Sequence, residues 1–196
     1  MKCENITRDK ILMTAARLFA DKGFEATSMR EIAESCELTK PALYYYFQDK
    51  NTLFAEIINA IANYSVQFLT EIYQSDKDPI NKLYDIVIMQ VTRLKQNPEI
   101  TKFLINAPIR NIPNETKVEF YKQMQKNKEM LINIITEGKE KGYLKSDLDV
   151  NAFLYCYVGG INQFIIDHIK NGTENLNEQN ANVIVRTLLD GARWCT

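Results

Sequence analysis

Chemically reactive residues are scarce in this 196-residue chain. It has a single histidine, and its four cysteines, Cys3, Cys36, Cys156 and Cys195, lack the short spacings that are typical of metal ligands. No Ser-His-Asp or Cys-His set can be assembled, and no glycine-rich segment follows a strand to hold a phosphate. The sequence therefore argues against an enzyme and indicates no metal and no cofactor.

An excess of charge and a long apolar run are also missing. The formal net charge is −1, and residues 1–50 carry equal numbers of basic and acidic side chains, so any contact with nucleic acid has to come from a local patch. No apolar run reaches the ~18 residues of a membrane span, and residues 1–9 are polar and charged, unlike a signal peptide. We expect a cytoplasmic protein that does not enter a membrane and keeps its thiols reduced.

The chain does contain apolar residues, 45% of the total, which recur at the three-to-four-residue spacing of amphipathic helices. We expect an all-α protein of about nine helices. Their predicted ranges are 7–22, 28–36, 39–47, 50–74, 79–96, 99–107, 115 to 138 or 142, 150–169 and a last helix through residues 183–194, with a loop at 110–114.

Two short helices near the N-terminus carry clear start signals. Ser28 and Glu31 have the spacing of a capping box, in which a hydroxyl and a carboxylate each bind a free backbone N–H. Thr39 is a second candidate N-cap, and Pro41 follows it in the first turn, where proline costs little. A turn of about four residues joins the two segments, which predicts a helix-turn-helix.

The second of these helices has an unusual outward face. Leu43 and Phe47 lie four residues apart and can anchor it, whereas the three tyrosines 44–46 cannot all be buried by one helix. Exposed aromatic rings with hydroxyls suit a surface that contacts thymine methyls and phosphates, although a protein interface would show the same pattern. Asp49 is predicted to cap the next helix, whose first residue, Lys50, is placed to bind a phosphate together with free backbone donors.

These residues resemble the N-terminal signature of the TetR-type bacterial transcriptional regulators. The matching positions are Ile32-Ala33, Thr39, Leu43-Tyr44-Tyr45-Tyr46-Phe47, Lys50 and Leu53, and the close match covers about the first 55 residues. The resemblance implies that Arg30, Lys40, Pro41, Ala42, Tyr44 and Tyr45 approach base edges, that Ser28, Tyr46 and Lys50 hold the DNA backbone, and that Thr39 belongs to the same interface.

Two positions depart from the family pattern. Glu37 stands in the turn where the family usually has glycine, at a position that often requires a positive φ, so we expect strain of about 1 kcal/mol there. A carboxylate is also unfavourable near DNA. Ala42 replaces a residue that is often a hydroxyl in relatives, which removes a possible base contact.

The sequence predicts two domains, a helix-turn-helix head at 1–50 and a C-terminal ligand-binding and dimerisation domain at 51–196. The helix at 50–74 is longer than a small head needs, so it is expected to link the two as a lever. The last two helices carry more apolar surface than one chain can cover, which predicts a homodimer through a four-helix interface. The resemblance implies the same arrangement.

The predicted function is that of a homodimeric repressor that binds a palindromic DNA operator and is released by an unknown small-molecule ligand. The candidate pocket residues are Tyr64, Phe68, Phe103, Phe120, Met124, Tyr155 and Phe164, with Asn162 and His168 as polar groups that orient the ligand. The plainer interpretation makes the apolar ones ordinary core residues and His168 a helix-end residue. The alternative function is a DNA-binding dimer controlled by a partner or by no ligand.

Overall fold

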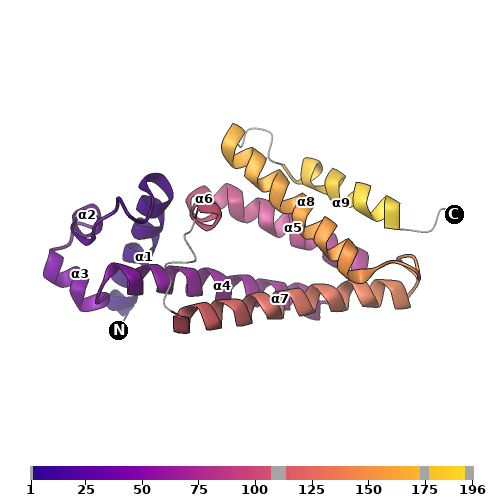
Figure 1. The fold of residues 1–196 in the computed structure, drawn as a ribbon, viewed down its shortest axis with the longest axis horizontal. Helices are drawn as coiled ribbons and strands as arrows, with labels where there is room; N and C mark the ends of the chain where they lie inside the picture. The colour runs from indigo at the N-terminus through magenta and orange to yellow at the C-terminus, as the bar shows by residue number, and fades with distance from the viewer. Residues whose placement is uncertain (1, 107–113, 173–176, 193–196) are drawn as a thin grey trace. The chain divides into compact units, whose positions relative to one another are not determined.

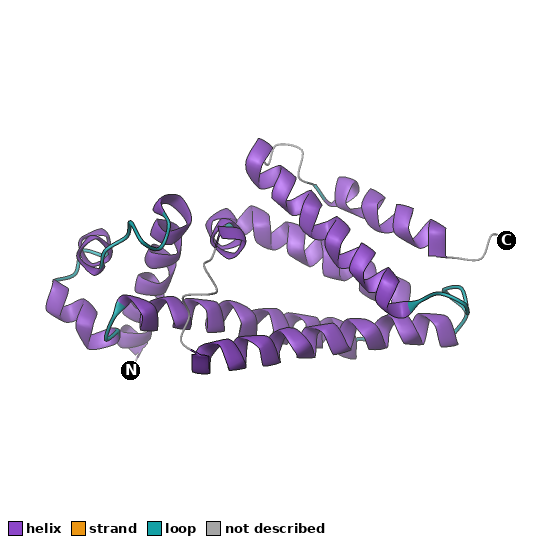
Figure 2. Cartoon of the chain, in the orientation of Figure 1, coloured by secondary structure: helices purple, strands orange, loops and turns teal. Residues whose placement is uncertain are grey.

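The computed structural model of the chain describes residues 2–106, 114–172 and 177–192, and every regular element within these ranges is an α-helix (Figures 1 and 2). The helices are α1 (Lys2–Lys22), α2 (Met29–Ser35), α3 (Lys40–Tyr46), α4 (Lys50–Gln74), α5 (Pro79–Gln96), α6 (Pro98–Asn106), α7 (Asn114–Glu140), α8 (Val150–Asn171) and α9 (Glu178–Ala192). The all-α prediction is confirmed. None of these helices is both long and apolar enough to span a membrane.

Most helix bounds fall where the capping residues, glycines and prolines predicted them, and the start of α1 differs. Helix α1 begins at Lys2 and not after Thr7, because residues 2–6 contain no proline or glycine that would stop the helix from extending upstream. Helix α7 passes through Gly138 and ends at Glu140, next to the second of its two predicted ends, Gly142, which has a positive φ of 76°. The predicted loop at 110–113 and the predicted helix end at 193–194 lie outside the described residues.

The chain packs as two compact units. One contains Met1–Tyr64 and Asn97–Gln123, and the other contains Ser65–Gln96 and Met124–Thr196. We call them the head unit and the C-terminal unit. Their boundaries fall within α4 and α7, not at residue 50, and α6 belongs to the head unit. These are units of packing, so the predicted functional division at residue 50 stays a prediction.

An aromatic cluster forms the centre of the head unit. The Phe54 ring lies 4.9 Å from the Phe24 ring and 5.2 Å from the Phe103 ring, measured between centroids, and Phe19 contacts all three. Burying a phenylalanine side chain contributes about 2 kcal/mol. Since Phe103 comes from α6, this helix is part of the core that supports the helix-turn-helix.

The C-terminal unit is held by the apolar faces of its helices. Leu83 and Leu94 of α5 and Ile134 of α7 are fully buried, and α5 and α8 both pack against α9 (Figure 1). The hydroxyl of the buried Tyr157 donates a hydrogen bond to the Leu83 carbonyl oxygen at 2.6 Å. Burial raises the pKa of Tyr157 well above its ordinary value, so this bond keeps its proton at any ordinary pH.

Candidate nucleic-acid interface

The start of α2 is fixed by the predicted cap. The Ser28 hydroxyl accepts a hydrogen bond from the Glu31 backbone N–H at 3.2 Å. The Glu31 carboxylate bonds to the Lys22 ammonium, which is the main reason why the pKa of Glu31 is lowered, and the Ser28 backbone N–H adds a smaller effect in the same direction. The side chains of Ser28 and Glu31 therefore each bind the backbone N–H of the other residue, as in a capping box. Lys22 connects the end of α1 to this end of α2.

The turn after α2 has the left-handed residue that the sequence predicted. Glu37 has φ 59° and is the only non-glycine with a positive φ among the described residues. Its N–H donates to the Glu34 carbonyl at 3.0 Å, and the Leu38 N–H donates to the Ala33 carbonyl at 2.9 Å, which together form a Schellman motif. The Glu37 carboxylate lies 3.4 Å from the Lys10 ammonium, which offsets part of the negative charge.

Helix α3 presents the predicted outward face. The Thr39 hydroxyl accepts from the Ala42 N–H at 3.3 Å, and Leu43 and Phe47 are fully buried against the rest of the head unit. Tyr44 is 42% exposed and Tyr45 is 76% exposed, and Lys40 is exposed as well. Because the anchoring residues occupy the inner face, the two tyrosines and the lysine are free to meet a partner.

The remaining predicted contact residues differ in how accessible they are. Arg30 is exposed, but its Nε donates to the Glu34 carboxylate at 2.7 Å, so it has to exchange this partner to reach a base. Pro41 is exposed and Ala42 is half-buried. Tyr46 packs partly against the core of the head unit, with its ring at 5.3 Å and edge-on to that of Tyr45.

Lys50 differs most from its prediction. Its ammonium donates to the carbonyl oxygens of Phe24 at 2.8 Å, Thr27 at 3.0 Å and Glu25 at 3.5 Å. It also lies 4.3 Å from the centre of the Phe24 ring. In the structure this side chain therefore faces the loop between α1 and α2, and its donors bind the protein's own backbone.

Sequence reasoning missed the contacts by which Thr27 and Lys50 bind this loop. The buried Thr27 donates through Oγ1 to the Gly23 carbonyl at 2.9 Å and lies 3.3 Å from the Leu18 carbonyl. A threonine four residues after a helix-ending glycine is a local signal that could have been read. The partners of Lys50 lie more than 20 residues upstream, and no spacing rule points to them.

The predicted ligand-pocket residues do not form one group. Phe103 is buried in the core of the head unit, and the half-buried Phe120 packs against that core. Tyr155 is 65% exposed, and Asn162 is also exposed. Both lie off the buried face of α8, which is formed by Phe153, Leu154, Tyr157, Ile161 and Ile165, so the structure corrects their predicted place inside a pocket of this unit.

The other candidates have ordinary surroundings. The ring of His168 lies 4.1 Å from that of Phe164, and its Nδ1 is 2.8 Å from the Phe164 carbonyl oxygen one turn earlier. Phe164 itself packs against the core of the C-terminal unit. Phe68 and Met124 are half-buried, and Tyr64 is 47% exposed. A shared pocket for these residues stays a prediction.

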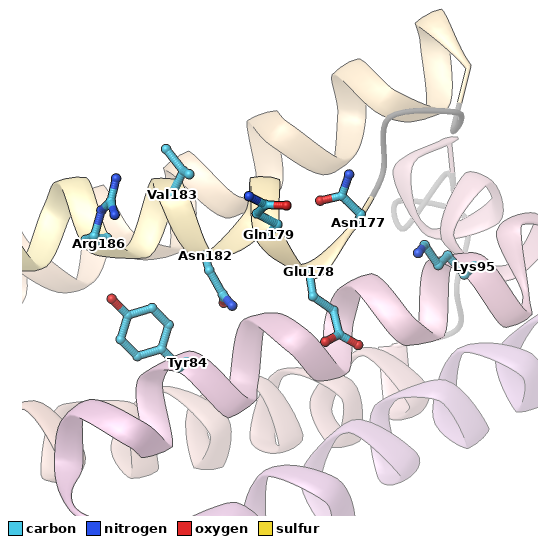
Figure 3. A pocket seen from close by; sticks show the side chains of 8 residues that line it. All are labelled: Tyr84, Lys95, Asn177, Glu178, Gln179, Asn182, Val183 and Arg186. Carbon is cyan, nitrogen blue, oxygen red and sulfur yellow. The ribbon is translucent and has the colours of Figure 1, made fainter.

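A groove of about 900 Å³ lies between α5 and α9 in the C-terminal unit (Figure 3). Its lining is mostly polar and consists of Tyr84, Lys95, Asn177, Glu178, Gln179, Asn182, Val183 and Arg186. Asn182 and Glu178 point toward α5, whereas Val183 and Arg186 point away from it (Figure 3). None of the predicted pocket residues lines this groove, and its mixture of charges defines no class of ligand.

Comparison with known proteins agrees with the geometry of α2 and α3. The family described as "Bacterial regulatory proteins, tetR family" matches residues 11–57, which run from α1 to the first third of α4. The HTH-type transcriptional repressor KstR2 of Mycobacterium tuberculosis is 22% identical over 148 residues, covering 75% of this chain and 74% of KstR2. The chain belongs to the TetR family of bacterial regulatory proteins. As a TetR-family member it is a DNA-binding regulator of transcription, and relatives such as KstR2 are named repressors.

Solved structures show that this TetR-family chain has the fold of the family along nearly its whole length. The structure of KstR2 from M. tuberculosis superposes with a TM-score of 0.81 at 19% identity, covering 96% of this chain and 95% of that one. FadR from Bacillus subtilis in complex with stearoyl-CoA gives 0.78 at 17% identity, with coverages of 94% and 98%. At these identities the likeness establishes the fold alone.

Proposed function

We propose that the chain is a homodimeric repressor that binds a palindromic operator through α3. The observation that carries this proposal is the exposed row of Lys40, Tyr44 and Tyr45 on a helix that is anchored by the fully buried Leu43 and by the buried C-cap Phe47. A helix of seven residues spans only a few base pairs. Two copies are needed to read a longer site, and a twofold pair of heads reads a palindrome.

The proposed DNA contacts follow the predicted roles. Lys40, Pro41, Ala42, Tyr44 and Tyr45 of α3 enter the major groove, and Arg30 approaches base edges from α2. Ser28, Thr39 and Tyr46 contact the DNA backbone at the edges of the groove. This assignment is supported by the exposure of Lys40, Tyr44 and Tyr45 and by the two N-caps, which fix the ends of both helices.

We propose that α8 and α9 form the dimer interface. Several residues on one face of α8 are exposed in the single chain although they are apolar or small, among them Tyr155, Cys156 and Gly159. A Cβ added at Gly159 would meet no atom within 4 Å. Small residues on an exposed helix face allow a second helix to approach closely, which fits a symmetric pair.

A small-molecule effector is the second part of the proposal. The FadR structure contains stearoyl-CoA, which supports ligand control in this chain too. A ligand that binds the DNA-incompatible state about 100-fold more tightly shifts the equilibrium by about 2.7 kcal/mol at saturation. The helix α4 runs from Lys50 to Gln74 and is proposed as the lever that transmits this shift to α3. Cytoplasmic location is part of the same proposal.

One observation favours the alternative of a dimer without a ligand. Within the described part of the C-terminal unit the core is closely packed, with Leu83, Leu94 and Ile134 fully buried, and the α5–α9 groove is open and polar. In that version a partner protein, or the concentration of the dimer alone, controls operator occupancy.

The test of operator binding is selection of bound fragments from a random DNA library by the full-length chain. We expect a palindrome whose half-sites lie about 10 base pairs apart, because two heads of a dimer enter successive major grooves. A selected sequence without twofold symmetry would remove the dimer from the proposal, and no enrichment would remove α3 as the reading helix. Titration of the selected duplex complex with stearoyl-CoA and other compounds that raise the Tm then separates the two versions, since only the ligand version predicts release.

A further inference from the structure

Lys50 is the first residue of α4, and its side chain faces the loop between α1 and α2. An ammonium group has three N–H donors and no acceptor. In the structure it lies within 3.5 Å of three carbonyl oxygens, those of Phe24, Glu25 and Thr27. Every donor therefore has a partner inside the protein, and binding a phosphate would require the ammonium to give one up.

These carbonyls belong to the loop that joins α1 to α2. A short loop leaves many backbone groups without partners in secondary structure, so side chains or water must satisfy them. Here the Thr27 hydroxyl binds the Gly23 carbonyl at 2.9 Å, and Lys50 binds the next carbonyls along the loop. Two side chains thus organise the backbone from Gly23 to Thr27.

The ammonium also sits over the Phe24 ring at 4.3 Å. That ring is itself held by Phe19 and Phe54, at 5.4 Å and 4.9 Å between centroids. A cation over an aromatic face contributes more as it loses contact with water. The charge of the half-buried Lys50 therefore lies between carbonyl dipoles and a packed aromatic ring.

The loop ends at Ser28, the N-cap of α2. We propose that Lys50 is a positioning residue for DNA binding: its ammonium holds the loop carbonyls and thereby the start of α2, and it does not contact phosphate. This rests on the proposed function in so far as Ser28 and Arg30 meet DNA. The phosphate contact that the family resemblance implies for Lys50 is replaced by an action through the loop.

The two roles differ in their dependence on salt. Each phosphate contact by a cationic side chain adds about 0.9 to the slope of log K against log salt concentration, because counterions are released from the DNA. Loss of a phosphate contact therefore lowers the slope by about one. Loss of a positioning residue weakens binding at every salt concentration and leaves the slope nearly unchanged.

The deciding variant is Lys50→Met, which keeps an unbranched side chain of similar length but has no donor. Lys40→Met is the matched control, since Lys40 is exposed on α3. On the duplex selected from random DNA, we expect Lys50→Met to bind about 10-fold more weakly with a slope within about 0.3 of the wild type. Lys40→Met removes a cation that enters the groove between the phosphate backbones in the proposed complex, so it should lower the slope by more than Lys50→Met does. A slope reduced by about one in Lys50→Met overturns the proposal, and so does an unchanged affinity.

Amide hydrogen exchange gives a readout that needs no DNA. The N–H groups of Glu31 and Ile32 bond to the Ser28 hydroxyl and carbonyl oxygens. In Lys50→Met we expect both amides to exchange about 10-fold faster, while the N–H groups of Ala42 and Leu43, which bond to Thr39, keep their rates. The proposal is contradicted if Lys50→Met changes the exchange rates of all four amides by the same factor or changes none of them. If the wild-type chain selects no duplex, the proposed function is wrong. The hydrogen-exchange measurement then still decides whether Lys50 holds the start of α2.

Reductive methylation of the wild type covers the case in which Lys50→Met does not fold. We expect Lys50 to be modified slowly both with and without the selected duplex, because its ammonium is occupied by carbonyls. Lys40 should be modified rapidly in the free protein and slowly in the complex. Rapid modification of Lys50 in the free protein, with protection only by DNA, would show a phosphate contact and overturn the assignment.

Discussion

The two units of the chain end a helix with the same motif but with different residues. At the end of α2 in the head unit, Leu38 and Glu37 donate to the carbonyls of Ala33 and Glu34. At the end of α7 in the C-terminal unit, Tyr143 donates to Gly138 at 2.8 Å and Gly142 to Lys139 at 3.1 Å. The left-handed position is Gly142 in one case and Glu37 in the other. Only the head unit places a strained residue there, next to the helix proposed to read DNA.

The exposed surfaces of the two units differ in a parallel way. On α3 the exposed groups are a lysine and tyrosines fixed by a Thr39 cap and buried anchors. On α8 the exposed face contains Tyr155 but also Cys156 and Gly159, which project little. Side chains that project suit insertion into a groove, whereas a shallow face suits contact with another helix. The comparison therefore supports the proposal that the first surface meets DNA and the other meets a second copy of the chain.

The largest effect is expected from Gly159→Arg on α8. The new side chain meets no atom of its own chain near its Cβ, so the monomer should fold, but the charge would be buried in the proposed dimer. We expect loss of the dimer and a fall in operator affinity of about 100-fold or more, because two linked heads bind far more tightly than one. Sedimentation equilibrium and operator titration measure the two effects. Gln125→Arg on the exposed side of α7 is the control, and a dimer that persists in Gly159→Arg would place the interface elsewhere.

The next largest effect is expected from Tyr45→Ala on α3. Tyr45 is 76% exposed, so its loss should leave the Tm within about 2 °C. Operator affinity should fall about 10-fold to 100-fold, the range for loss of a good base contact. Tyr121→Ala removes a tyrosine that is 59% exposed on α7 and should leave the affinity as it is. Equal effects of the two variants would show that α3 is not the reading helix.

The outcome at these positions shows which parts of the site a sequence reveals. The caps Ser28 and Thr39 were predictable because a cap depends on residues within four positions. The positive φ of Glu37 was expected only from the family resemblance, since a glutamate gives no local signal for a left-handed turn. Exposure of Tyr44 and Tyr45 followed from the periodicity of α3. The bonds from Lys50 to the loop were not predictable, since they join residues 23 and 26 positions apart.

The same limit applies to the residues predicted to line a ligand pocket. An amphipathic pattern shows which face of a helix is buried but not what covers it. Phe103 was therefore predicted to line a ligand site, although it packs between Phe19 and Phe54 in the head unit. Helix α8 is apolar on nearly all sides, so its pattern did not identify the exposed face that holds Tyr155.

The strained turn gives a pair of variants with opposite signs. Glu37→Gly should stabilise the protein by about 1 kcal/mol, because glycine adopts φ 59° without a Cβ clash. Gly142→Ala should destabilise it by about 1 kcal/mol for the same reason, since its added Cβ meets no atom within 4 Å and only the backbone conformation is affected. Urea unfolding measures both changes. Glu37→Gln keeps the strained backbone and removes the charge. Any gain in operator affinity that it shares with Glu37→Gly is therefore caused by the loss of the carboxylate. A loss of stability in Glu37→Gly would mean that the Lys10 contact outweighs the strain.

The smallest effect concerns the pH dependence of the α2 cap. The Lys22 ammonium, and to a lesser extent the Ser28 N–H, lower the pKa of Glu31 in the folded protein. A group with a lowered pKa contributes stability above its unfolded pKa, about 4.3 for glutamate, and this contribution disappears as the pH falls through the folded pKa. Glu31→Gln should therefore lower the Tm slightly at pH 7 and not at pH 2.5, and the difference at pH 7 should shrink in 1 M salt because the Lys22 pair is exposed to solvent. Glu71→Gln, which removes an exposed carboxylate from α4, should show no comparable pH dependence. A Tm difference for Glu31→Gln that is the same at both pH values would mean that the charge of Glu31 does not stabilise the start of α2.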